Sequence, residues 1–202
     1  MKRVIVLFIF LVFGFGLQAQ VKTVYYFGDE VITDSALVKS FATSFAVYGK
    51  LSNDSVYTYK RYDIYNSLIS IGAFKDEALK IPHGKFKHYL TVDQFNELYN
   101  SAFYTEDHAS FLYEEGQFID GLSTGRWISY YPTGKIFATV NFENGLKDGE
   151  FVSYNAKGDV ETLGTYKNGK KEGDWLYKRG KKKVFYVNDV IQKKVGAKVN
   201  TN

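Results

Sequence analysis

Three histidines are the side chains of this sequence best suited to bind a metal or to transfer a proton. They are His83, His88 and His108, and the chain contains no cysteine. His83 and His88 are five residues apart on an expected strand, so their side chains should point to opposite faces. They therefore cannot form a simple paired metal site. His108 could join one of them from a loop, but we favour histidines in surface turns and predict no metal and no cofactor.

Paired carboxylates offer a second kind of chemistry, either general acid–base catalysis or binding of a hard cation. The pairs are Asp76 with Glu77, Glu114 with Glu115, and Asp93 with Glu97. No nucleophile motif or phosphate-binding loop accompanies them, because the glycines of this chain recur as turn residues. Solvated turns and an exposed helix face account for these charges. The sequence therefore predicts a protein that is not an enzyme.

Lysines near the C-terminus are the residues best placed to bind a specific ligand. Residues 20–166 carry 13 basic and 19 acidic side chains (13 − 19 = −6), whereas residues 167–194 carry 10 and 3 (10 − 3 = +7). A basic region of this kind attracts anions. We predict possible anion binding at Lys170, Lys171, Lys181, Lys182 and Lys183. The alternative is that these lysines keep an exposed sheet edge soluble and prevent edge-to-edge pairing.

Glycines and aromatic residues that recur every 24 residues indicate the elements that carry these side chains. The columns are Phe118, Phe142 and Tyr166; Gly121, Gly145 and Gly169; Gly125, Gly149 and Gly173; and Trp127, Phe151 and Trp175. Asp-Gly or Asn-Gly stands at the Gly121 column, and these dipeptides accept the positive φ angles of a tight hairpin turn. Each unit is therefore a predicted β-hairpin. Glycine in the Gly125 column favours a β-bulge.

A second set of turns joins each hairpin to the next, at residues 132–134, 156–158 and 178–180. The sequence thus predicts an all-β fold, an elongated, twisted antiparallel meander of 24-residue β-hairpin repeats. Along the strand that begins at Ile136, alternation places two sets of side chains on opposite faces. One face carries Ile136, Ala138, Val140 and Phe142, and the other carries Phe137, Thr139 and Asn141. One face should be the core, because a lone two-stranded hairpin is marginal in water.

Departures from the repeat define the remaining segments. Thr91-Val92-Asp93-Gln94 forms a capping-box pattern, which predicts a short helical insert near residues 91–100. Residues 33–49 are interpreted as a short helical turn followed by a strand, and Val184–Val190 as a closing strand. The predicted segments are a signal peptide (1–19), an N-terminal capping segment (20–54), divergent β-hairpin repeats (55–90), a helical insert and loop (91–108), the repeat array (109–195) and a tail (196–202).

The first residues are typical of a secretory signal peptide. Met1-Lys2-Arg3 precedes an apolar run from Val4 to Leu17, which is too short to span a bilayer, and we expect cleavage after Ala19. An uncleaved anchor is the alternative. The protein is therefore expected to be exported and soluble in the periplasm or outside the cell, and no nucleic-acid partner is expected there. Without cysteine it has no disulfide, so packing and sheet hydrogen bonds must stabilise it.

The repeat columns resemble a known family, the MORN-type repeat, in its longer bacterial variant. Gly116, Phe118, Gly121, Gly125, Trp127, Tyr130, Tyr131, Gly134 and Lys135 carry the pattern best. The resemblance is strong across residues 116–181 and weaker across 55–90. It implies a long twisted sheet that serves as a scaffold or protein-binding surface without catalytic residues. Some bacterial relatives are labelled antitoxin components.

We therefore expect an exported, non-enzymatic interaction or scaffold module of the cell envelope, with a protein as its partner. One alternative is binding of an anionic lipid or glycan through the basic C-terminal hairpins. Another is an antitoxin-like or immunity-like role. The sequence makes no prediction of the oligomeric state.

Overall fold

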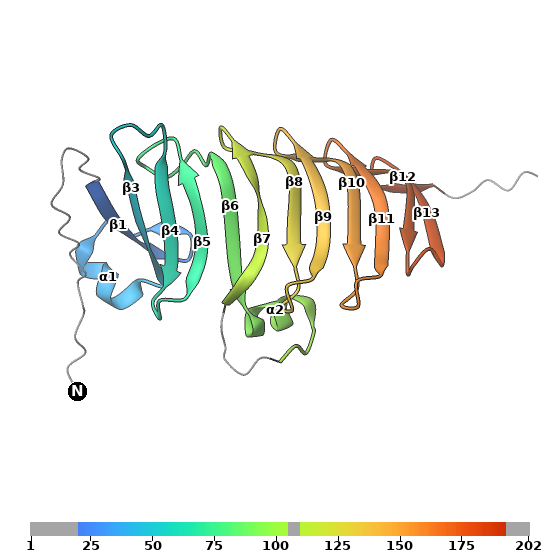
Figure 1. Ribbon diagram of the computed structural model, residues 1–202, viewed down its shortest axis with the longest axis horizontal. Helices are drawn as coiled ribbons and strands as arrows, with labels where there is room; N and C mark the ends of the chain where they lie inside the picture. The colour runs from blue at the N-terminus through green and yellow to red at the C-terminus, as the bar shows by residue number, and fades with distance from the viewer. Residues whose placement is uncertain (1–19, 105–109, 193–202) are drawn as a thin grey trace, which may run out of the picture.

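The computed structural model describes residues 20–104 and 110–192 (Figure 1). Within these residues, 14 strands form one open antiparallel sheet. The strands are β1 (Gln20–Phe27), β2 (Glu30–Val31), β3 (Ser44–Lys50), β4 (Tyr57–Asp63), β5 (Leu68–Phe74), β6 (Gly84–Thr91), β7 (Ser110–Ile119), β8 (Leu122–Tyr130), β9 (Ile136–Glu143), β10 (Leu146–Tyr154), β11 (Val160–Lys167), β12 (Lys170–Tyr177), β13 (Lys182–Val187) and β14 (Val190–Gln192). The helices of this part of the chain are α1 (Ser35–Phe41) and α2 (Val92–Tyr99).

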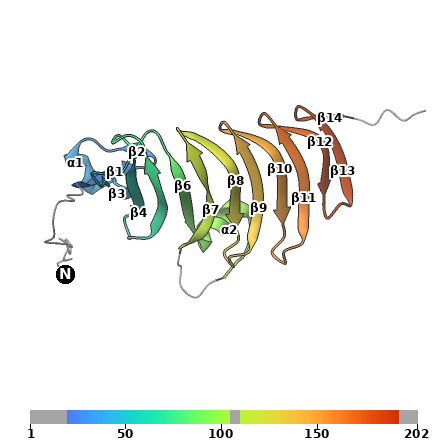
Figure 2. The same cartoon turned by 45° about the horizontal axis from the view of Figure 1, so that its top comes forward.

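The strands lie side by side along the long axis of the molecule (Figures 1 and 2). From β3 to β14 each strand pairs with the next one in the chain. The N-terminal end departs from this order, because β1 pairs with β3 and β2 pairs with the far side of β1. This arrangement confirms the predicted all-β antiparallel meander.

Tight turns form where the sequence predicts them. Asp120, Asn144 and Asn168 have φ angles of 51°, 49° and 49°, and the glycine after each also has a positive φ. Two consecutive positive φ angles define the type I′ turn, whose twist matches that of the two strands it connects. The hairpins are therefore fixed by residues that tolerate the left-handed region.

The predicted bulges are also present. Glu115 pairs with Ile128 and Gln117 pairs with Thr124, so the segment 125–127 on β8 stands opposite the single residue 116 on β7. The register shifts in the same way at Gly149 on β10 and at Gly173 on β12. These extra residues bend the strands, and positive φ angles at the three bulge glycines make the bend possible.

One row across the sheet alternates aromatic rings with glycine or valine. From β4 to β13 the row reads Tyr59, Gly72, Phe86, Gly116, Trp127, Val140, Phe151, Gly164, Trp175 and Val184. Trp127 lies over Gly116, where a Cβ atom would be 2.1 Å from the indole. Trp175 lies over Gly164 in the same way. We call this side of the sheet the ring face.

Further rings on the ring face join the strands by edge-to-face contacts. The ring of Phe118 packs against Phe86 and Trp127, with centroid distances of 5.0 and 5.1 Å. Tyr166 packs against Trp175 in the same way, at 5.0 Å. Trp127 and Trp175 are only 5% and 1% exposed. The ring face is therefore the main core of this single-layer sheet.

Helix α2 makes a second core on the opposite side, which we call the helix face. Its capping box is present, since Thr91 Oγ1 accepts from the Gln94 amide and Gln94 Oε1 accepts from the Thr91 amide. Phe95 is 1% exposed and contacts the rings of Tyr131 and Phe137. The expectation of a single buried face is therefore incomplete, because the helix also buries the Phe137 side of the sheet.

The ends of the sheet test the remaining predictions. Residues 33–49 form α1 followed by β3, as predicted. The single closing strand Val184–Val190 is wrong, because Asn188 and Asp189 adopt φ angles of 50° and 69° and turn the chain into β14. The predicted signal peptide, the tail and His108 lie outside the described residues. In the described part of the chain, neither helix has the length and apolarity needed to cross a bilayer.

Substitution of Gly116 tests whether the rings need glycine beneath them. Gly116→Ala should cost about 1–3 kcal/mol of unfolding free energy, because the new methyl group overlaps the indole of Trp127. Trp127→Ala alone should cost about 3–5 kcal/mol of unfolding free energy. In a protein that already carries Trp127→Ala, adding Gly116→Ala should cost much less, because the indole is gone. Urea unfolding of the four proteins measures the coupling.

Gly134→Ala is the matched control, since Gly134 lies in a turn where an added Cβ atom would have no neighbour within 4 Å. Its cost should be the same with or without the indole. Equal costs of Gly116→Ala in both backgrounds would contradict the ring-over-glycine account.

Candidate functional site

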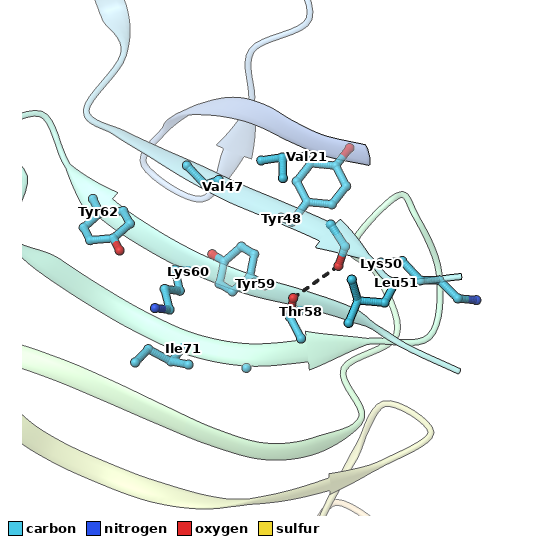
Figure 3. Close-up of a pocket in the computed structure, with 12 residues that line it drawn as sticks. Val21, Val47, Tyr48, Lys50, Leu51, Thr58, Tyr59, Lys60, Tyr62 and Ile71 are labelled. Atoms are coloured by element: carbon cyan, nitrogen blue, oxygen red, sulfur yellow. Dashed lines mark hydrogen bonds between the residues drawn. The ribbon is translucent and has the colours of Figure 1, made fainter. Parts of the chain in front are cut away.

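An open groove of about 600 Å³ lies on the helix face of β1, β3, β4 and β5 (Figure 3). Register places Thr23, Val47, Lys60 and Ile71 in one row across these four strands. The lining is mainly apolar, and it is formed by Val21, Val47, Tyr48, Gly49, Lys50, Leu51, Thr58, Tyr59, Lys60, Tyr62, Ile71 and Gly72. Helix α2 packs against later strands, so this part of the helix face is left open.

The charges of the groove have one sign. Lys50 and Lys60 line it, and no carboxylate does. The ammonium of Lys50 lies 5.3 Å from the centre of the Tyr57 ring. Lys60 is exposed and forms no ion pair with a described residue. The groove therefore combines apolar walls with an available cation.

Exposed apolar side chains continue beyond the groove on the same face. Tyr25 is 38% exposed and Phe27 is 57% exposed. The rings of Tyr25, Phe45 and Tyr62 form a row, with centroid distances of 6.2 and 5.6 Å between neighbours. Apolar surface that is contiguous in this way marks an interaction site more often than scattered exposed residues do.

The predicted anion-binding lysines do not form one surface. Lys171 lies on the ring face, where its ammonium is 4.4 Å from the Trp175 ring centre and 3.0 Å from the Tyr177 hydroxyl. Lys183 lies on the helix face and pairs with Asp174 at 2.7 Å.

The other three lysines of that set are exposed. Lys182 stands opposite Tyr177 on the ring face, whereas Lys170 and Lys181 lie near opposite ends of β12. The structure thus divides the set between two faces and two strand ends. Lys171 packs against the terminal rings, where it has a structural role.

The repeat-defining residues form the turns, the bulges and the ring row of the sheet. Gly121, Gly145 and Gly169 lie in the tight turns, and Gly125, Gly149 and Gly173 lie in the bulges. Trp127, Phe151 and Trp175 belong to the ring row. None of these residues lines the groove.

The described histidines are engaged in the sheet. His83 Nδ1 lies 3.1 Å from Asp120 Oδ1, in a contact between the residue before β6 and the turn after β7. His88 stacks on Trp127, and burial lowers its pKa. In the described ranges, no group of three acidic or histidine side chains has the geometry of a metal site.

Glu114 lies directly opposite His88 on the ring face. Burial raises the pKa of Glu114, and a hydrogen bond from Ser129 Oγ, at 3.2 Å, partly opposes that shift. Burial thus favours the neutral form of both side chains. This is the behaviour of groups inside a core, and it gives no support for an acid–base site.

Comparisons of this chain with protein-family models, with curated proteins and with solved structures give no match. The class that fold and site define is an open antiparallel meander with one buried face and one partly open face. The MORN-type resemblance remains a prediction.

The groove is the feature that sequence reasoning missed. Val21, Thr23, Tyr25 and Phe27 alternate with other residues, a pattern that could have indicated β1. Nothing local indicates that β1 pairs with β3, or that apolar residues of four strands meet on one uncovered face.

Glu114→Gln tests the buried carboxyl group. Because the folded pKa of Glu114 lies above its unfolded value, the native state binds the proton more tightly and its stability falls as pH rises above about 4.3. The amide cannot ionise, so the variant should be more stable than the wild type at pH 8. The advantage should shrink to nothing near pH 4, as measured by urea unfolding across this range. Exposed Glu143→Gln is the control and should show no such trend.

Proposed function

We propose that the mature chain is a non-enzymatic protein-binding scaffold of the cell envelope, and that the groove with its exposed apolar surroundings is the binding surface. The observation that carries this proposal is the contrast between two parts of one face. Phe95 of α2 buries the helix face over the later strands. Over β1 to β5 the Phe41 ring of α1 packs against Phe27 at one end of this face, and the groove beside it stays open.

A protein fits this surface better than a compact small molecule. The groove is open, and its Tyr62 begins a row of rings that continues through Phe45 to Tyr25, so its ligand must cover an extended apolar area. A rim of polar groups around apolar anchors is usual for protein interfaces. Lys60 supplies such a group and favours a carboxylate on the partner.

The location in the envelope rests on the signal-like segment at residues 1–19. Cell fractionation with an antibody against the folded part tests it, since the mature protein should be recovered outside the cytoplasm. Binding of anionic lipid or glycan is less well supported, because the C-terminal lysines are divided between faces and Lys183 is paired. The antitoxin-like alternative has no feature of the groove in its favour.

Val21→Asp tests the binding surface. Val21 lines the groove and is 65% exposed, so a carboxylate there should leave the fold intact while it disrupts an apolar contact. We expect recovery of the partner to fall at least about tenfold, the effect of losing one interface anchor. The measurement is quantitative mass spectrometry of proteins cross-linked to the tagged chain in envelope preparations.

Val160→Asp is the matched control, since Val160 is 42% exposed on β11 and lies away from the groove. It should leave recovery unchanged. A partner recovered equally by both variants and the wild type would exclude the groove as the binding surface.

A further inference from the structure

We propose that the partner binds as an added β-strand along the open edge of β1, with alternate side chains directed toward the groove. This inference rests on the proposed function and specifies its partner, which is an extended segment of another protein. It arises from the backbone of β1 and from the groove beside it.

The first residues of β1, Gln20–Val24, form an unpaired edge of the sheet. The inner side of β1 pairs with β3 from Gln20 to Tyr26 without a register shift. Its outer side pairs with β2 only at Tyr26 and Phe27, next to a bond from the Ile32 amide to the Tyr25 carbonyl. The rest of the outer side meets no described strand.

The direction of the backbone groups follows from two hydrogen bonds. The Tyr26 carbonyl accepts from the Thr43 amide, on the β3 side, whereas the Tyr25 carbonyl accepts from Ile32, on the outer side. Backbone groups alternate between the two sides along an antiparallel strand. The N–H and C=O groups of Val21 and Thr23 therefore point to the open side, where an added strand can bind them.

The two ends of the sheet differ in their protection. Natural edges are blunted by short strands, lysines or proline. The C-terminal edge has both of the first two features, since β14 has three residues and Lys182 and Lys183 lie on the strand beside it. β1 has eight residues and no proline, and its Lys22 is engaged by Glu77. A short strand also lies at this end, but β2 pairs only with Tyr26 and Phe27 of β1, so the open edge runs from Gln20 to Val24. An unprotected edge of this kind is a template for strand addition.

The groove indicates which side chains the added strand carries. Residues that pair with Val21 and Thr23 project onto the helix face, beside the apolar walls. Thr23 also lies in the row that contains Val47 and Lys60. The fitting segment therefore has an apolar residue at every second position on this face, and a nearby carboxylate that faces Lys60.

A second copy of this chain fits the edge less well. If Thr23 stands opposite Thr23 of an antiparallel second copy, residue 20 falls beside Tyr26 of that copy, whose outer side β2 already occupies. A change in the register of the two strands that relieves this overlap places Lys22 of one copy opposite Lys22 of the other, on the ring face. Like charges directly opposite each other destabilise a strand pair.

Thr23→Pro and Thr23→Ala form the test. Proline removes the outward N–H that an added strand would bind, but it leaves the inward bonds to β3 intact, and edge strands tolerate proline in this orientation. The probe is a library of random nine-residue peptides displayed on phage and selected on the immobilised mature protein. Enriched peptides should alternate apolar and polar residues and contain acidic ones. Their affinity should change little for Thr23→Ala and fall at least about tenfold for Thr23→Pro.

A second measurement covers the case in which Thr23→Pro fails to fold, which circular dichroism would show. N-methylation of alternate residues of an enriched peptide removes its own backbone donors, and the wild-type protein should then bind it at least about tenfold more weakly when the methylated set faces β1. Methylation of the other set should have little effect.

Several results would overturn strand addition. One is equal affinity of the enriched peptides for both Thr23 variants. Another is an affinity that N-methylation does not change. A third is enrichment of peptides whose apolar residues recur every three or four positions, as on one face of a helix. A wild-type dimer that Thr23→Pro converts to a monomer, by light scattering, would assign the edge to a second copy. If no peptide is enriched while Val21→Asp still abolishes partner recovery, strand addition fails and the proposed function stands. If Val21→Asp has no effect on recovery, the proposed function itself fails.

Discussion

The contact of an aromatic ring with a glycine of the preceding strand is the constraint on which this sheet depends. A single-layer sheet has no second layer to bury its rings. Trp127 and Trp175 instead lie over Gly116 and Gly164, where a side chain would occupy the same space. The rings thereby lose their contact with water and connect each hairpin to the next. Where Val140 replaces the glycine, the ring on the following strand is Phe151, which is smaller than tryptophan.

Burial of the rings on one face determines what the other face can do. The ring face buries most of the large rings of the hairpins, which leaves the helix face for other contacts. Over the later strands the chain uses it for α2, whose Phe95 inserts among rings from several strands. Over β1 to β5 the same face carries the groove and the exposed rings. One fold thus separates a structural surface from the surface that we propose for binding.

An open sheet also has two edges, and this chain treats them differently. The C-terminal edge ends in a strand of three residues next to lysines, a combination that discourages further pairing. At the N-terminal edge β2 pairs only with Tyr26 and Phe27 of β1. Gln20–Val24 therefore lies open beside the groove, and backbone hydrogen-bonding groups and apolar side-chain contacts are available in one place. Lysines predicted to bind anions are thus better explained as protection of an edge and, for Lys171, as packing on Trp175.

Features set by neighbours in the chain were determined by the sequence alone. Asn144-Gly145 specifies a tight turn, Gly149 a bulge, and Thr91 with Gln94 the start of α2, because each of these interactions joins residues a few positions apart. The groove, the open edge and the second core required the tertiary structure. Val21 and Ile71 line one groove only because β1 pairs with β3, and the purpose of Gly116 becomes visible only when register places Trp127 above it. Such contacts depend on which strands become neighbours, and the residues of a single strand do not encode that choice.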